Sequence, residues 1–306
     1  MVALQQVIIL FSLIVVGYII KKLHIVKDSM KDDISNLVIN VTLPAFIISS
    51  MASSFSVEIL ENSLTLIIIS FSMYFFAIAL GLIYTKIIRV KGKRRDIFRY
   101  IIAFSNCGFM GYPVVDAILG KQGVFYTAIF NLGFTTLVWT YGVYMIKSKR
   151  NRKMSIKGSL KSMVTPALIA VVTGFTIFIF QIKLPFFIKE ILSMVGGVTT
   201  PLSMMLIGFI LSEIHIKDIV SDKKVYLLAI ARLIIMPGSV YLALSFLGIS
   251  GYVLQIPVLI AAMPAAANTA IIASKYGGDY QLASKGIFIT TLLSIVTIPL
   301  VISFIQ

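Results

Sequence analysis

The sequence predicts an all-α integral membrane protein with ten transmembrane helices in two inverted five-helix repeats, of which helices 4 and 9 are broken and cross each other. Three observations predict this fold class. Of the 306 residues, 58% are hydrophobic and only 13% are charged, whereas a soluble domain carries about 25% charged residues. Lysine and arginine gather in alternate loops, and prolines recur at similar distances, 157 and 151 residues, within the apolar stretches.

Ten apolar stretches, separated by polar or charged breaks, account for nearly the whole chain. Most of them supply the roughly 20 residues that a helix needs to cross the hydrocarbon core of a bilayer. The expected helices are residues 2–20, 34–52, 63–88, 100–119, 123–146, 163–182, 185–211, 225–247, 252–273 and 283–304. The first stretch lacks the basic start and cleavage motif of a signal peptide, so we expect it to be retained.

The basic residues orient these helices. The loops after helices 1, 3, 5, 7 and 9 hold 23 of the 27 lysines and arginines, whereas the other loops hold only Lys121, Lys183 and Lys189. Because cytoplasmic loops are enriched in these residues, both termini are expected outside, in a multi-pass protein of the plasma membrane. The net charge of +15 is then expected to border the lipid bilayer on its cytoplasmic side, with no nucleic-acid partner.

Prolines within the predicted helices reveal an internal repeat. Pro44 and Pro201, in helices 2 and 7, lie 157 residues apart, and Pro113 and Pro264, in helices 4 and 9, lie 151 apart. Five spans separate each pair, so the second copy must enter the membrane from the opposite side, as in inverted-repeat transporters. The predicted parts are a first repeat at 1–146, a short basic cytoplasmic linker at 147–162 and a second repeat at 163–306.

Pro113 and Pro264 are expected to break helices 4 and 9 halfway through the membrane, because proline lacks an N–H and clashes with the preceding turn. Unwound backbone at that depth is tolerated only where it lines a cavity or is buried in protein. Each proline is expected to open the second half of its helix, which aims two helix N-termini at the midplane. Such an arrangement suits a small anion, especially a carboxylate. The alternative is that both prolines merely kink packed helices.

Small and polar residues around the two prolines form the expected substrate site. The amide of Asn106 can donate to a carboxylate or cap the broken helix. Asn268 is its counterpart beyond Pro264, or else bonds to another helix. The expected substrate-binding residues are Asn106, Cys107, Gly108, Gly111, Pro113, Pro264, Ala265, Ala266, Asn268 and Arg232.

Two charged residues lie within predicted helices. Arg232 is expected to draw anions toward the site or to pair with a carboxylate, unless it extends to the cytoplasmic interface. Asp116 is a weak candidate for coupling to protons or sodium ions, or else a solvated carboxylate near the outer surface. A single cysteine and two distant histidines, His24 and His215, predict no metal site, and no cofactor is expected.

Three sequence motifs resemble the auxin efflux carrier (PIN-type) family. The stretch NCGFMGYP at 106–113 resembles the family's fourth-helix motif. The stretch AAMP at 261–264, followed by ASKYG at 273–277, resembles its ninth-helix signature, and Arg232 with Pro237 is similar to its eighth-helix pattern. Ten spans with both termini outside also fit, and the resemblance covers essentially the whole chain.

The resemblance implies a transport domain of helices 3–5 and 8–10 that moves as an elevator against a scaffold of helices 1, 2, 6 and 7, often dimeric. It implies small organic anions as substrates, either auxin or mono- and dicarboxylates such as malate and malonate. The linker at 147–162 is much shorter than the loop of many plant members, which favours a bacterial-type carrier.

One other class of transporter stays open, namely a proton- or sodium-coupled cation antiporter or solute symporter with a related broken-helix fold. That class would normally place more acidic ligands near the crossing than Asp116 alone. An enzyme is not expected, because the sequence contains no HExxH motif and no acidic pair placed for hydrolysis within the membrane.

Overall fold

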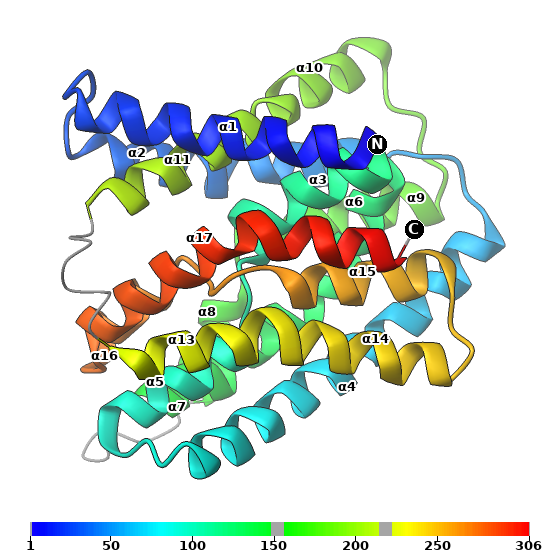
Figure 1. Cartoon of the computed structure of the whole chain (residues 1–306). Helices are drawn as coiled ribbons and strands as arrows, with labels where there is room; N and C mark the ends of the chain where they lie inside the picture. The colour runs from blue at the N-terminus through cyan, green and yellow to red at the C-terminus, as the bar shows by residue number, and fades with distance from the viewer. Residues whose placement is uncertain (1, 148–155, 214–221, 306) are drawn as a thin grey trace. The chain divides into compact units, whose positions relative to one another are not determined.

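A computed structural model describes residues 2–147, 156–213 and 222–305, and all regular secondary structure in these ranges is helical (Figure 1). Half of the predicted linker, residues 148–155, lies outside the described ranges, as does the predicted loop residue His215. The α-helices are α1 (Val2–Lys22), α2 (Met30–Leu37), α3 (Leu43–Met51), α4 (Val57–Ile87), α5 (Gly92–Ala103), α6 (Tyr112–Leu137), α7 (Val143–Ile146), α8 (Ile156–Met163), α9 (Pro166–Ile179), α10 (Phe186–Gly197), α11 (Thr199–Ser212), α13 (Lys223–Ile230), α14 (Met236–Phe246), α15 (Gly251–Ala262), α16 (Thr269–Tyr276) and α17 (Tyr280–Ile305). Short π-helical segments adjoin several of them, namely η1 (Val38–Thr42), η2 (Cys107–Gly111), η3 (Val138–Gly142) and η5 (Ala231–Ile235).

Seven helical stretches of the described chain are long and apolar enough to cross a membrane, which confirms the all-α membrane class. They are Gln5–Lys22, Met30–Met51, Val57–Ile87, Cys107–Ile146, Phe186–Ser212, Lys223–Phe246 and Tyr280–Ile305. Predicted helices 4 and 5 merge into the 40-residue stretch Cys107–Ile146, although Gly120, with φ of +64°, interrupts its helical conformation. Two other predicted spans contain the shorter apolar helices α9 and α15. The count of ten spans and the inverted repeat therefore stay predictions.

The described chain forms two compact units. Unit 1 comprises Met1–Leu66, Gly108–Leu132 and Val164–Glu213. Within it, α1 packs along α11 through Gly17 and Gly208, where a Cβ would collide with the backbone of the facing helix. Small residues of this kind let membrane helices approach closely, so these glycines set the packing of unit 1.

Unit 2 comprises Ile67–Cys107, Gly133–Met163 and Ile214–Gln306. In this unit α17 contacts α13, α15 and α16, and α14 packs on α15. A buried aromatic cluster surrounds the end of α5, where the ring centroids of Tyr100 and Phe104 lie 4.8 Å apart and those of Tyr74 and Phe104 lie 6.0 Å apart. The cluster packs around the point at which α5 stops.

Candidate functional site: two paired helix breaks

Two helices of unit 2 stop and pair with each other through their extended backbones. Helix α5 ends at Ala103 and α15 ends at Ala262, and Ser105 and Ala265 then face each other as an antiparallel bridge. The Asn106 N–H donates to the Pro264 carbonyl at 2.9 Å, and the Ala266 N–H donates to the Phe104 carbonyl at 3.3 Å. Backbone polar groups need partners wherever water is absent, and this pairing supplies them. We call residues 104–106 and 264–266 the crossing.

The two prolines take different positions relative to the breaks. Pro113 is the second residue of α6, but η2 directly precedes it and helical conformation already resumes at Cys107. Pro113 therefore does not open the second half of its helix, and the break precedes it at 104–106. Pro264 lies within the extended segment, and the next helix begins only at Thr269. The expectation that Pro264 opens the second half of its helix was therefore wrong, because its carbonyl accepts the Asn106 N–H and keeps the segment extended.

Arg232 binds the carbonyl ends of both broken helices. Its side chain is only 1% exposed, and Nη1 donates to Ile102 of α5 at 2.9 Å. Nη2 donates to Ala261 at 3.0 Å and to Ile260 at 3.3 Å, both in α15, and Nε donates to Met263 at 3.0 Å. The last carbonyls of a helix have no partner inside the helix and carry its partial negative charge. One guanidinium therefore caps two helices.

This arrangement changes the interpretation of Arg232. The side chain is buried, and its hydrogen-bond partners in the described ranges are backbone carbonyls, not a carboxylate. Arg232 lies in the π-helical segment η5, a kind of segment that often occurs at functional sites. The signal in the sequence was an isolated charge within predicted helix 8, but the sequence did not identify its partners.

A threonine of α17 completes the crossing, and sequence reasoning missed it. The Ala265 N–H donates to Thr290 Oγ1 at 3.1 Å, and Thr290 Oγ1 donates to the Gly286 carbonyl at 2.6 Å. Thr290 is fully buried. Its hydroxyl thus satisfies one N–H of the crossing and anchors that segment to α17.

The structure brings six of the predicted site residues together in unit 2, namely Asn106, Cys107, Pro264, Ala265, Ala266 and Arg232. Cys107 Sγ lies 3.1 Å from Ser105 Oγ and 3.4 Å from the Tyr74 hydroxyl, so it belongs to a polar cluster. Asn268 precedes α16, and its buried Oδ1 has no hydrogen-bond partner among the described residues. This oxygen is a hydrogen-bond acceptor two residues beyond the crossing, where it could accept a hydrogen bond from a ligand.

The remaining predicted site residues, Gly108, Gly111, Pro113 and Asp116, belong to unit 1. A Cβ at Gly108 would meet no atom within 4 Å, so this glycine borders open space. Asp116 is partly buried and forms no salt bridge within the described ranges. The described residues also contain no cluster of three histidine, cysteine or acidic side chains that could hold a metal ion.

Comparison with known proteins gives one consistent result. Residues 2–302 match the family model described as "Membrane transport protein". The chain is 28% identical to an uncharacterized transporter of Methanocaldococcus jannaschii, with 98% of each chain covered. It is 27% identical to an uncharacterized transporter of Methanothermobacter thermautotrophicus, with 97% of this chain and 96% of the other covered. A Rhizobium meliloti protein described as "Putative malonate transporter" is 22% identical, with 94% of this chain and 91% of the other covered.

Proposed function

Since the chain belongs to the membrane transport protein family, to which the auxin efflux carriers belong, we propose that it carries small organic anions by alternating access. The family and the similar proteins are transporters, not enzymes. We assign mono- or dicarboxylates such as malate or malonate as substrates. The similarity to a protein described as a malonate transporter supports this substrate class.

The observation that carries the proposal is the crossing. Backbone that leaves helical conformation within a membrane is tolerated only where it lines a cavity or is buried in protein. Each helix end carries about half an elementary charge, negative at the C-terminus and positive at the N-terminus. Arg232, with one full positive charge, offsets the two C-terminal ends that it caps. The helices that resume after the breaks keep their positive N-terminal ends, which favour an anion.

In this proposal the residues of the two broken segments have different roles in binding the anion. Asn106 and Asn268 donate side-chain amide hydrogens to the carboxylate. The small residues, namely Cys107, Gly108, Gly111, Ala265 and Ala266, let the anion approach the backbone, and Pro113 and Pro264 keep the helices interrupted. Arg232 acts as a positioning residue. Asp116 is the candidate for coupling to protons or sodium ions.

We further propose an elevator motion, in which predicted helices 3–5 and 8–10 move against a dimeric scaffold of helices 1, 2, 6 and 7, with both termini outside the plasma membrane. Unit 1 contains α1–α3 and α9–α11, and unit 2 contains most of α4 together with α5 and α13–α17. The two compact units thus support the proposed division into a scaffold and a transport domain. Residues 108–132, from predicted helices 4 and 5, fall in unit 1, so the boundary runs through α6.

Uptake into proteoliposomes tests this function. Labelled malate, malonate and indole-3-acetate are offered with and without gradients of pH and sodium ions. We expect uptake of at least one of these anions. Flux of protons or sodium ions without any organic anion would instead support the cation antiporter or symporter.

The Asn106→Ala variant tests the site. We expect it to lose most of the uptake while staying folded and inserted, because the variant lacks the amide donor at the crossing. Asn36→Ala, at an exposed position of α2, is the matched control and should transport normally. Normal uptake by well-expressed Asn106→Ala protein would refute the site.

A further inference from the structure

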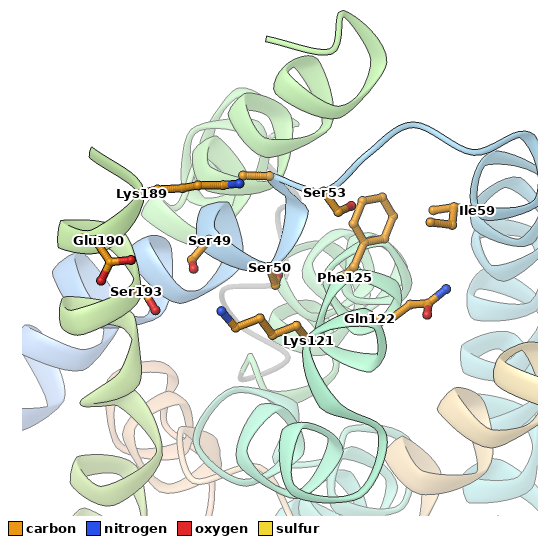
Figure 2. Close-up of a pocket in the computed structure, with 11 residues that line it drawn as sticks. Ser49, Ser50, Ser53, Ile59, Lys121, Gln122, Phe125, Lys189, Glu190 and Ser193 are labelled. Atoms are coloured by element: carbon orange, nitrogen blue, oxygen red, sulfur yellow. The ribbon is translucent and has the colours of Figure 1, made fainter. Parts of the chain in front are cut away.

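A cavity of about 480 Å³ lies entirely among residues of unit 1. Small-molecule sites typically occupy about 300–1,000 Å³. Three segments form most of its wall, namely the end of α3, the part of α6 that follows Gly120, and α10 (Figure 2). The sequence predicts that all three border the outer surface, and the cavity shares no residue with the crossing.

Two lysines from different helices line this cavity. Lys121 comes from α6 and Lys189 from α10, and both extend toward the middle of the cavity, where Ser49 and Ser50 lie (Figure 2). Both lysines are exposed, and neither forms a salt bridge with any residue in the described ranges. Only three basic residues fall in the loops predicted to be outside, and this cavity contains two of them.

The other polar groups of the cavity fit a small anion. Ser49, Ser53 and Ser193 offer hydroxyls, and Gln122 offers an amide. Glu190 is the one acid among the lining residues, so the two lysines leave the cavity with a net positive charge. Positive charge in a cavity raises the local concentration of anions there.

We propose that this cavity is a second, outer binding site for a small organic dianion such as malonate. Lys121 and Lys189 each pair with one carboxylate, and the serine hydroxyls donate further hydrogen bonds. The proposal takes its class of ligand from the proposed function. It adds that dicarboxylates are collected at the outer face by residues that take no part in the crossing.

Malonate binding to the purified protein in detergent tests this site, measured by calorimetry in an Asn106→Ala background that removes binding at the crossing. We expect Lys121→Gln and Lys189→Gln each to weaken binding about threefold and the double variant about tenfold, as for solvent-screened charge pairs. Glu190→Gln should strengthen binding, because it removes a repelling carboxylate. Lys183→Gln is the matched control, since Lys183 is the remaining basic residue of the predicted outer loops and does not line the cavity.

Equal malonate affinity in the parent protein and the double lysine variant would overturn the proposal. So would acetate binding as tightly as malonate, because a dianion site must favour two carboxylates over one. Lysine-dependent malonate binding without any organic anion uptake would keep this site and refute the proposed function. Conversely, malonate uptake that depends on Asn106, together with unchanged malonate binding in the lysine variants, would support the proposed function and refute this second site.

Discussion

Arg232 in unit 2 and the pair Lys121 and Lys189 in unit 1 show how surroundings decide what a cation does in a membrane protein. Arg232 is 1% exposed and donates to four fixed carbonyls. The two lysines are exposed and have no salt-bridge partner in the described ranges. A buried charge must be satisfied by the fold itself, so Arg232 serves structure. An exposed charge without a fixed partner is available to a mobile ion.

The largest expected effect comes from Arg232→Met. This change removes the Arg232 donors from the carbonyls of Ile102, Ala261 and Met263, whereas the Ile260 carbonyl still accepts the Met263 N–H. At about 1–3 kcal/mol for each of the three unsatisfied groups, the total is comparable with the stability of a whole domain. We expect little folded protein, measured as the yield of monodisperse protein and its unfolding temperature in detergent. Lys121→Met, at the exposed site, should change the free energy of unfolding by less than about 0.5 kcal/mol.

Arg232→Lys sharpens this test. Lysine keeps the charge but has three donors on one atom and lacks the planar fork of arginine, so we expect intermediate stability. Wild-type unfolding temperatures for Arg232→Met would contradict the role in capping α5 and α15.

Thr290→Val is expected to have the next largest effect. Valine keeps the shape of the side chain but leaves the buried Ala265 N–H without its acceptor, which costs about 1–3 kcal/mol. Thr290→Ser retains the hydroxyl and should restore most of that stability. Equal unfolding temperatures for the valine and serine variants would show that the hydrogen bond adds nothing to the crossing.

The smallest expected effect concerns Lys21, a cation between the two extremes. Its side chain is 7% exposed, but it pairs at 2.6 Å with Asp28, whose side chain is 96% exposed. The hydrogen bond from Lys21 lowers the pKa of Asp28 below its usual 3.8. A carboxyl group whose pKa is lower in the folded protein stabilises the fold at any pH above its pKa in the unfolded chain, about 3.9. That stabilisation disappears as the pH falls through the pKa of the folded state.

Asp28→Asn should therefore lower the unfolding temperature slightly at neutral pH. The difference from the parent protein should shrink as the pH falls below about 4 and as salt is added. A difference that stays constant across this pH range would mean that the pair contributes nothing through charge.

The sequence predicted the features that depend on local chemistry. Long apolar stretches predicted helices of the membrane class, and small polar residues before Pro113 and around Pro264 indicated that two helices are interrupted. It did not predict that the first break lies at 104–106, because that position depends on pairing with 264–266, far along the chain. Such non-local hydrogen bonds leave no periodic signal.

The hydrogen-bond partners and neighbours of the site residues were harder to predict than the positions of those residues in the sequence. Arg232 stood out as an intramembrane charge, yet the carbonyls that it binds carry no side-chain signature. Thr290 resembles any other threonine of an apolar helix until the Ala265 N–H is placed beside it. The cavity of unit 1 is lined by residues from three segments that are separated in the sequence, so the presence of Lys121 and Lys189 in one cavity could not be inferred from their spacing.

The cap on α5 also has a consequence for the order of assembly. The Ile102 carbonyl receives its hydrogen bond from an arginine 130 residues further along the chain, and the segment that pairs with 104–106 comes later still. As the ribosome delivers the protein from its N-terminus, α5 is made with an end that nothing yet available can complete. The first interruption is thus finished only when η5, which carries Arg232, and the segment after α15 have been made. A chain that stops before Arg232 leaves α5 uncapped.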